Sequence, residues 1–160
     1  MRLTVYTDYS LRVLMFLALK GDGLATIAEI AKAYGISKNH LMKVTHQLGL
    51  AGYVETVRGK GGGMRLARMA DVIVLGEVVR RTEPDMALVP CFALGDTSCA
   101  ILSSCALRVT LFRARDAFLS TLDGTTLADL VRPRAPLQSL LSLRPGGRAP
   151  PRIARPVRRA

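Results

Sequence analysis

Residues 26–50 read TIAEIAKAYGISKNHLMKVTHQLGL, and this stretch decides the fold. Thr26 is followed three residues later by Glu29, which is the spacing of a capping box at the start of a helix. Gly35 is a typical helix end, and Ser37 is a typical N-cap for a second helix. Two short helices joined by a tight, glycine-containing turn predict a helix-turn-helix.

The second of these helices has two unlike faces when its residues are placed about 100° apart. Its apolar face carries Leu41, Val44 and Leu48. Its polar face carries Asn39, Lys43 and His46. A polar face of this kind is typical of any solvated helix, so a role in reading DNA needs support from the neighbouring sequence.

That support comes from residues 53–58 and 64–67, two β-capable runs that flank the glycine-rich turn GKGGG. The pattern predicts a β-hairpin. The basic residues gathered on it are Arg58, Lys60, Arg65 and Arg68. We therefore interpret the hairpin as a wing that grips phosphates beside a reading helix. A nucleotide-binding P-loop is excluded, because Lys60 is followed by Gly61 and no GxxxxGK precedes it.

Further helices are expected on both sides of this unit. Residues 7–20 should form a supporting helix with Thr7 as N-cap, and residues 71–81 should form another with Asp71 as cap. A long helix over residues 105–122 carries an apolar stripe. The stripe consists of Leu107, Leu111, Ala114, Phe118 and Leu122. It packs either on its own domain or on a twin helix, and paired DNA half-sites favour a dimer.

The formal charge of +11 is unevenly distributed along the chain. Residues 1–80 carry a net +5, residues 81–143 are neutral, and residues 144–160 carry six arginines and no acid. This excess of positive charge favours nucleic acid as a partner. The N-terminus lacks a secretory signal pattern, and no apolar run approaches the ~20 residues of a membrane span. A cytoplasmic protein without a membrane partner is expected.

These patterns together predict a mostly α protein with a winged helix-turn-helix, a long dimerisation helix and a cysteine-bearing loop. Residues 1–82 form the DNA-binding region, and residues 83–104 form the loop. Residues 105–143 contain the dimerisation helix and a short helix around TLADLV. Residues 144–160 are rich in proline and poor in large apolar side chains, which predicts a disordered basic tail.

All three cysteines, Cys91, Cys99 and Cys105, fall within fifteen residues. Their odd number speaks against a disulfide framework and for a reducing compartment. Three interpretations remain open, namely idle thiols, a structural zinc site and an iron-sulfur cluster. Zinc ligands usually lie two to four residues apart, whereas the gaps here are seven and five. Spacing alone does not decide between zinc and iron-sulfur.

Several segments, taken in order, resemble a known family. They are MRLTVYTDYSLRVLMFLAL, SKNHLMKVTHQL, AGYVETVRGKGGGMRLA, EVVRRTEPDMALVPCF, the three cysteines and TLADLV. Together they resemble the NsrR type of nitric-oxide-sensing repressor. This type belongs to a superfamily of dimeric winged-helix iron-sulfur regulators that also includes IscR and RirA. The resemblance covers residues 1 to about 141.

The resemblance implies a homodimeric repressor whose Cys91, Cys99 and Cys105 bind an iron-sulfur cluster. Three thiolates leave one iron of a 4Fe-4S cluster open. In similar proteins an aspartate in the TDY motif of the partner subunit takes that position, which corresponds to Asp8; read by itself, Asp8 is an acid favoured at a helix start. IscR-like proteins use a histidine where this chain has Arg108, so 4Fe-4S is favoured over 2Fe-2S.

The resemblance also implies where DNA and nitric oxide act. The residues expected near the major groove are Lys38, Asn39, His40, Met42 and Lys43. The residues expected on phosphates or in the minor groove are Arg58, Lys60 and Arg65. Nitric oxide is expected to attack the iron held by the exchangeable carboxylate. Losing Asp8 as a ligand then shifts the two reading heads and releases double-stranded operator DNA.

Two other functions remain open on the same fold. One is a regulator of iron or cluster availability, like RirA or IscR, and the other is a metal-free thiol redox switch. An enzyme is not expected and no catalytic residue is assigned. The chain has no Ser/His/Asp order, no paired catalytic carboxylates and no nucleotide loop, and both of its histidines lie on the reading helix.

Overall fold

The computed structural model describes residues 2–93, 95–96 and 98–143. Its helices are α1 (Val5–Lys20), α2 (Ile27–Tyr34), α3 (Lys38–Leu50), α4 (Leu75–Thr82), α5 (Ala106–Asp123), α6 (Leu127–Leu130) and α7 (Arg134–Leu140). The strands are β1 (Val54–Val57) and β2 (Gly63–Leu66), and short 3-10 turns are η1 (Ala70–Val72), η2 (Pro90–Phe92) and η3 (Leu102–Ser104).

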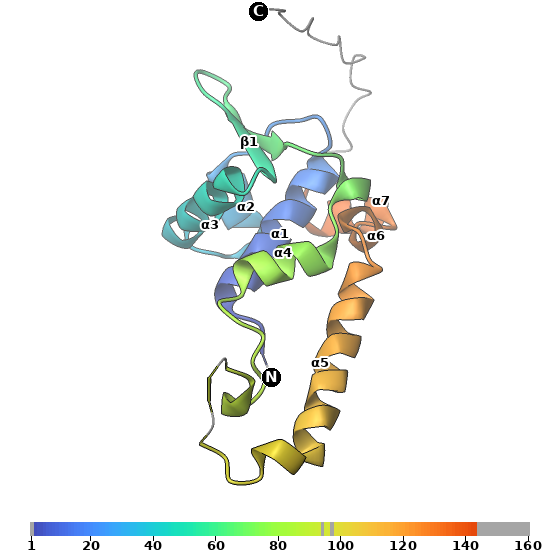
Figure 1. The fold of residues 1–160 in the computed structure, drawn as a ribbon. Coiled ribbons are helices and arrows are strands. Elements are labelled where there is room, and N and C mark those ends of the chain that lie inside the picture. The colour runs from blue at the N-terminus through green and yellow to red at the C-terminus, as the bar shows by residue number, and fades with distance from the viewer. Residues whose placement is uncertain (1, 94, 97, 144–160) are drawn as a thin grey trace, which may run out of the picture.

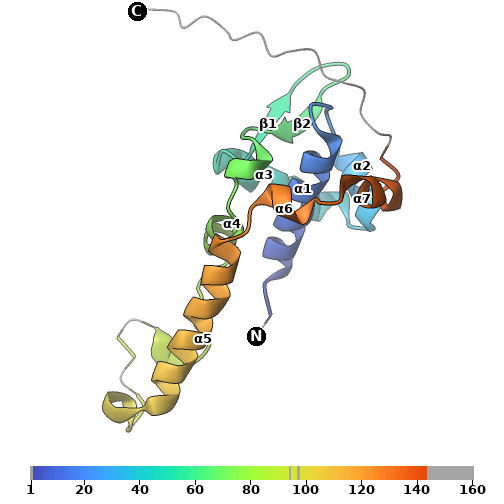
Figure 2. The ribbon, with the colours of Figure 1, turned by 90° about the vertical axis from the view of Figure 1, so that its right-hand side faces the viewer.

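Figures 1 and 2 show two regions of unlike shape. We call α1–α4, β1, β2, α6 and α7 the head, because these elements gather around α1. We call α5 together with residues 83–105 the arm, because α5 extends away from the head and the cysteine-bearing loop lies beside its N-terminal end. No helix in the described part of the chain is long and apolar enough to span a membrane.

The core of the head is aliphatic with one phenylalanine at its centre, as expected for a chain without tryptophan. The largest fully buried side chains include Leu14, Phe16, Leu17, Ile30, Leu41, Leu48, Ile73, Val78 and Leu127. They come from α1, α2, α3, α4, α6 and the segment before α4, and α1 packs against α3, α4, β2, α6 and α7.

Local capping signals start and end the first three helices. The Thr26–Glu29 capping box, the left-handed Gly35 (φ 66°) and the Ser37 cap are all present, which confirms those predictions. The predicted start of α1 is wrong, because Thr4 is the N-cap and its side chain accepts a hydrogen bond from Thr7 N. Thr4 is held there by a tertiary partner that the local pattern does not reveal, as described below.

The predicted hairpin is confirmed as two antiparallel strands. Val54 faces Leu66, and Glu55 faces Arg65. Met64 is buried, and its backbone exchanges hydrogen bonds of 2.8 and 2.9 Å with Ala25, just before α2. The wing is therefore tied to the helix-turn-helix by its backbone, and the chain has the predicted mostly α, winged helix-turn-helix fold.

The predicted helix over residues 71–81 is partly wrong. Residues Ala70–Val72 form η1, and α4 begins only at Leu75, after Val74, so Asp71 is not its cap. The β-branched residues before α4 take extended conformations instead. Ile73 accepts a hydrogen bond of 2.8 Å from Leu127 N, and Val74 forms a β-bridge with Thr126. Tertiary pairing therefore overrides the local helix pattern.

The C-terminal elements return the chain to the head. α5 begins after Cys105, close to the predicted position, and α6 begins at a Thr126–Asp129 capping box. α7 was not expected from the sequence. Its Arg134 and Gln138 side chains donate hydrogen bonds of 2.8 and 2.9 Å to carbonyls at the end of α1. The basic tail predicted over residues 144–160 lies outside the described residues.

Candidate nucleic-acid interface and cysteine-bearing loop

The reading helix α3 presents one face to the core and the other to solvent. Its apolar residues Leu41, Val44 and Leu48 are buried, at 0%, 2% and 1% exposure. The apolar face predicted from the sequence is therefore confirmed. The Thr45 hydroxyl is satisfied inside the helix, where it donates to Leu41 O at 2.8 Å. The exposed residues on α3 include Lys38, Asn39, His40, Met42 and Lys43. All five predicted major-groove residues are therefore accessible.

His40 also approaches α1. Its ring centroid lies 6.1 Å from that of Tyr9, with the two planes tilted by 41°. Tyr9 directly follows Asp8 in the first turns of α1. The reading helix is thus in contact with the part of α1 that carries the predicted cluster ligand.

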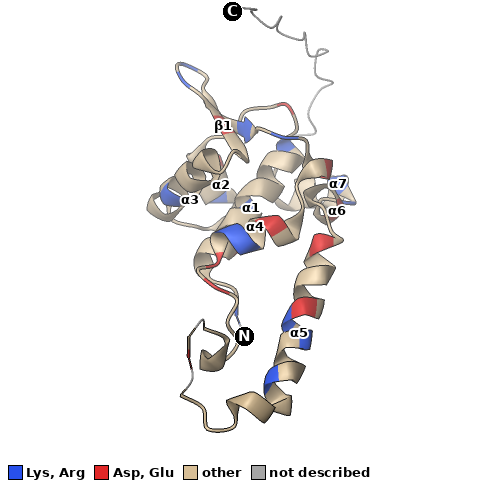
Figure 3. Ribbon diagram, viewed as in Figure 1, with Lys and Arg blue, Asp and Glu red and all other residues tan. Residues whose placement is uncertain are grey.

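The wing extends the basic surface beyond α3. Figure 3 shows Lys and Arg on α3 and on the hairpin that projects above it. Arg58 and Lys60 are exposed, and neither forms an ion pair within the part of the chain that the structure describes. Arg65 instead pairs with Glu55 across the strands. Of the three residues predicted to contact phosphate, Arg58 and Lys60 therefore carry charges with no ion-pair partner among the described residues, whereas the charge of Arg65 is partly neutralised by Glu55.

One arginine, Arg108, contacts both Cys91 and Cys105. Cys91 lies in η2, and Cys105 is the N-cap of α5, where its Sγ accepts a hydrogen bond from Arg108 N at 3.4 Å. The Arg108 side chain donates from Nε to Cys91 O at 3.3 Å. Cys99 lies exposed on the segment between them, and all three thiols are free. A set of three free thiols suits an iron-sulfur cluster, since thiolates are its usual protein ligands.

A stack of rings and guanidinium groups docks the loop on α5. The rings of Phe92 and Phe112 are stacked, with centroids 3.9 Å apart and an interplanar angle of 14°. Arg115 lies over both rings, at 4.6 Å from Phe112 and 5.4 Å from Phe92, and Arg108 lies 4.8 Å from Phe112. Such contacts are favourable at partly exposed sites. They hold the Cys91 side of the loop against α5.

Asp8 lies in the first turn of α1, as expected. Its Oδ1 accepts a hydrogen bond of 2.9 Å from Arg12 Nε, and both side chains are about half exposed. Within the described residues, no group of three or more His, Cys, Asp or Glu residues of this one chain is arranged to hold a metal ion. Within one protomer, therefore, the three cysteines are not gathered into a metal site among the described residues, and Asp8 does not join them.

A polar network ties the start of α1 to the start of the loop. Glu83 Oε1 accepts hydrogen bonds from Thr4 N at 2.8 Å and from Thr4 Oγ1 at 3.1 Å. The buried Thr7 hydroxyl donates to the Thr82 hydroxyl at 2.9 Å. Because Thr82 ends α4 and Glu83 opens the loop, the turn that carries Asp8 is fixed to the base of the loop.

Comparisons with known proteins identify the family. Residues 3–133 match the model of the Rrf2 family, described as iron-dependent transcriptional regulators. The chain belongs to the Rrf2 family. It is 50% identical over 147 residues to the HTH-type transcriptional regulator NsrR of Geobacillus kaustophilus, which covers 91% of this chain and all of that protein.

Solved structures agree with this assignment. CymR (YrzC), the global cysteine regulator of B. subtilis, matches with a TM-score of 0.68 and 31% identity, over 81% of this chain and 95% of CymR. T. potens IscR matches with a TM-score of 0.67 and 25% identity, over 86% of this chain and 91% of IscR. This Rrf2 protein is accordingly a DNA-binding transcriptional regulator and not an enzyme.

Sequence reasoning missed three features of this Rrf2 site, namely Thr4, Glu83 and the stack on α5. Glu83 and Thr4 are 79 residues apart, and no local pattern connects them. The stack on α5 left a signal, because Arg108, Phe112 and Arg115 follow one another at spacings of four and three, which places them on one helix face. That signal was obscured by the apolar stripe, which runs along the same helix.

Proposed function

We propose that the protein is a dimeric operator-binding repressor that senses nitric oxide through an iron-sulfur cluster held by Cys91, Cys99 and Cys105. A 4Fe-4S cluster is favoured over 2Fe-2S, with Asp8 of the partner subunit as the fourth ligand. When bound, the cluster supplies an iron centre that reacts with nitric oxide. The observation that carries the proposal is the presence of three free thiols on the loop at the end of the arm, two of whose residues, Cys91 and Cys105, contact Arg108.

The contacts around Asp8 support a link from the cluster to DNA. Asp8 directly precedes Tyr9, whose ring lies 6.1 Å from His40 on the reading helix. The same turn of α1 is held to the loop through Thr4 and Glu83. A change in what Asp8 binds therefore alters the position of the neighbouring Tyr9, which contacts His40 of α3. Because two heads must engage two half-sites at once, a small change in their placement weakens operator binding.

The surface of α5 supports a dimer. None of its residues is buried, and Leu107 and Val109 are 65% and 51% exposed. Beside it lies a cavity of about 540 Å³ whose lining includes Leu3, Met86, Leu88, Leu111 and Phe118. Exposed apolar side chains at one end of a helix that buries none of its residues, beside a partly apolar cavity, suit an interface. A second copy of α5 is the occupant we propose.

The deciding experiment is anaerobic purification followed by visible absorption, iron and sulfide analysis, and titration with operator DNA. The proposal predicts a coloured protein, cluster loss in Cys91→Ser, Cys99→Ser and Cys105→Ser, and an unaffected cluster in the loop control Ser104→Ala. Adding nitric oxide should bleach the protein and release DNA. An iron-free wild-type protein that binds its operator, with unaffected cysteine variants, would exclude the cluster.

The same experiment separates the remaining functions. A cluster that is lost on iron limitation but whose DNA complex survives nitric oxide identifies an iron- or cluster-availability regulator. A colourless protein that leaves DNA after treatment with hydrogen peroxide, and returns after treatment with dithiothreitol, identifies a thiol redox switch, for which exposed Cys99 is the natural first target.

A further inference from the structure

The arm joins the head at one well-defined junction. Leu75 N, at the start of α4, donates a hydrogen bond of 3.0 Å to Thr125 O, and Leu127 N donates one of 2.8 Å to Ile73 O. These bonds lie on either side of the bridge between Val74 and Thr126. Figures 1 and 2 show that α5 leaves the head from this point. These backbone bonds therefore fix the position of the C-terminal end of α5 against the head. The direction in which α5 points must be fixed by side chains.

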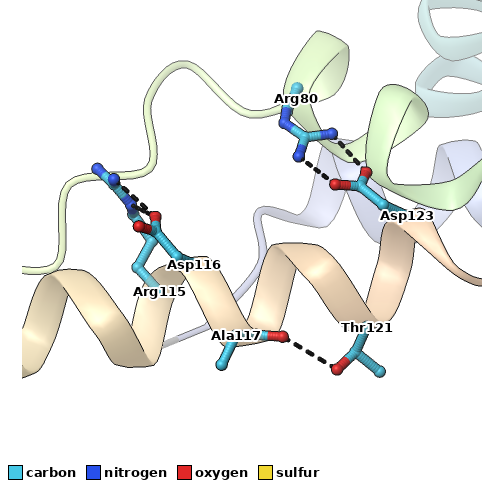
Figure 4. A network of polar contacts seen from close by, with 6 residues as sticks. All are labelled: Arg80, Arg115, Asp116, Ala117, Thr121 and Asp123. Atoms are coloured by element: carbon cyan, nitrogen blue, oxygen red, sulfur yellow. Dashed lines mark hydrogen bonds and ion pairs between the residues drawn. The ribbon is translucent and has the colours of Figure 1, made fainter.

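A bidentate ion pair also spans the junction, between α4 and the last residue of α5. Arg80 of α4 donates two hydrogen bonds of 2.6 Å to the two carboxylate oxygens of Asp123, near the end of α5 (Figure 4). Two parallel hydrogen bonds from one guanidinium to one carboxylate restrain orientation as well as distance. The pKa of Asp123 is lowered, chiefly by these hydrogen bonds, so its carboxylate is charged near neutral pH.

Gly76 makes this close approach possible. A Cβ atom at Gly76 would lie 1.8 Å from Asp123 Oδ1 and 2.9 Å from an Arg80 nitrogen. The carboxylate thus lies directly against the α4 backbone, and any larger residue at this position would displace it. Gly76, Arg80 and Asp123 form a compact unit, which we call the junction clamp.

Because α5 is long, a small change of angle at this junction produces a large displacement at its far end. Eighteen residues at ~1.5 Å each span about 27 Å, so a rotation of about 10° at the clamp moves the far end of α5 by about 5 Å. One base pair advances ~3.4 Å along DNA. A change of angle that is small at the clamp therefore corresponds to more than one base pair of half-site spacing.

We infer that the junction clamp sets the angle between the head and α5, and so determines which spacing between operator half-sites the dimer accepts. This inference rests on the proposed dimeric binding through α5. It assigns a positioning role to Arg80 and Asp123, both of which are close to half exposed and would add little to stability as a surface ion pair.

The test measures affinity for a series of duplexes in the full-length, cluster-loaded protein. The parent duplex is the inverted repeat that the wild-type protein selects from a randomised pool, and its relatives have one or two base pairs inserted or removed at the centre. A duplex with a single half-site reports on the head alone. The variants are Arg80→Gln, Asp123→Asn and the charge-exchanged double variant Arg80→Asp/Asp123→Arg, with thermal unfolding as a check of folding.

Asp116→Asn is the matched control, because it removes an aspartate that pairs with Arg115 within α5 and away from the junction (Figure 4). The single variants should lose about fivefold to tenfold of the preference for the parent spacing, as expected when two-site engagement becomes less well matched. Their affinity for the single half-site should equal that of the wild type. The double variant should regain part of the spacing preference, and Asp116→Asn should retain all of it.

Two results would overturn the inference, and they differ. Unchanged spacing preference in both single variants, with normal two-site binding by the wild type, excludes the clamp but leaves the proposed function intact. A wild-type protein that binds single and paired half-sites equally well contradicts the dimeric repressor, and the clamp with it. Arg80→Lys, which keeps the charge but not the fork, provides a milder variant should Arg80→Gln unfold.

Discussion

α1 and α5 are helices of similar length with opposite surroundings. Eight of the sixteen residues of α1 are buried, whereas none of the eighteen residues of α5 is. The side chains of α1 complete a core with every layer of the head. α5 instead leaves Leu107 and Val109 exposed near its N-terminal end, and its other large apolar residues are only half-buried. The head is therefore stabilised by its own chain, while the arm offers surface to other molecules.

This difference separates the effects of substitutions. Burying one large apolar side chain contributes roughly 1.5–3 kcal/mol, so the core residues of the head dominate the free energy of unfolding. Substitutions in the arm should act instead on association, on the loop and on the placement of the two heads. The predictions below test this division, beginning with the largest effect.

Phe16→Ala should be the most damaging change. Phe16 is 1% exposed, and its ring meets that of Tyr34 edge-on at 6.2 Å. Removing it should lower the free energy of unfolding by about 3–5 kcal/mol, measured by urea denaturation. Leu50→Ala, also in the head but at a side chain that is 69% exposed, should change it by less than about 0.5 kcal/mol. Equal losses would show that the head has no dominant core.

Leu107→Glu should affect the dimer and leave the head folded. A charge placed on the exposed apolar surface of the proposed interface should weaken association by about 2 kcal/mol or more, which is about thirtyfold in the dimer Kd measured by sedimentation. Circular dichroism should be unchanged. Leu140→Glu, at the 80% exposed end of α7, is the matched control and should leave the dimer intact. If only the control dissociates the protein, the dimer uses the head and not the arm.

The sequence predicted the head better than the arm, and the reason is the range of the contacts. Ser37 caps a helix through His40 N, three residues away, so its role is visible in the local pattern. Thr7 and Asp71 were wrongly expected to be caps, because Glu83 fixes Thr4 and the strand-like segment before α4 pairs with Thr126. Neither partner is nearby in sequence.

The arm shows the same limit at its site. The sequence alone groups the three cysteines, because Cys91, Cys99 and Cys105 lie close together along the chain. Their geometry depends on the stacking of Phe92 on Phe112 across twenty residues, which spacing does not encode. α7 was not predicted, and its first turn contains Pro136, a residue that usually disfavours a helix. Proline is tolerated at this position, because the backbone N–H groups of the first turn have no partner within the helix.

Arg108→Ala should loosen the loop without unfolding the head. It removes the hydrogen bond to Cys91 O and the contact with Phe112. Together these contribute about 1–2 kcal/mol to holding the loop closed, measured as faster hydrogen exchange of the amides around Cys91 in the cluster-free protein. Arg113→Ala, at an exposed position on the same helix, should leave the exchange rates unchanged. Equal exchange in both variants would contradict the bracing of Cys91 by Arg108.

Lys60→Ala should have a smaller effect, confined to the electrostatics of the head. Lys60 lies exposed at the turn of the wing, so its loss should reduce the slope of log K against log salt by about 1 with little change in sequence preference. Lys32→Ala is the control, because Lys32 is an exposed lysine on α2 outside the reading helix and the wing. A slope equal to that of the wild type would argue against wing contacts with phosphate.

Asp129→Asn should give the smallest effect, seen only in acid, at the point where the chain returns from the arm to the head. The Thr126 hydroxyl and backbone N–H donate to Asp129, and these bonds lower the pKa of its carboxyl. The ionised carboxylate thus stabilises the folded state above the unfolded pKa of about 3.9, and this contribution is lost as the pH falls through the lower folded pKa. The wild type and Asp129→Asn should therefore differ in unfolding free energy near pH 6 and converge near pH 2, in urea titrations. Thr126→Val, which removes the hydroxyl donor, should reduce the pH dependence in the same direction. A difference that is independent of pH would mean that the carboxylate charge makes no contribution to the cap.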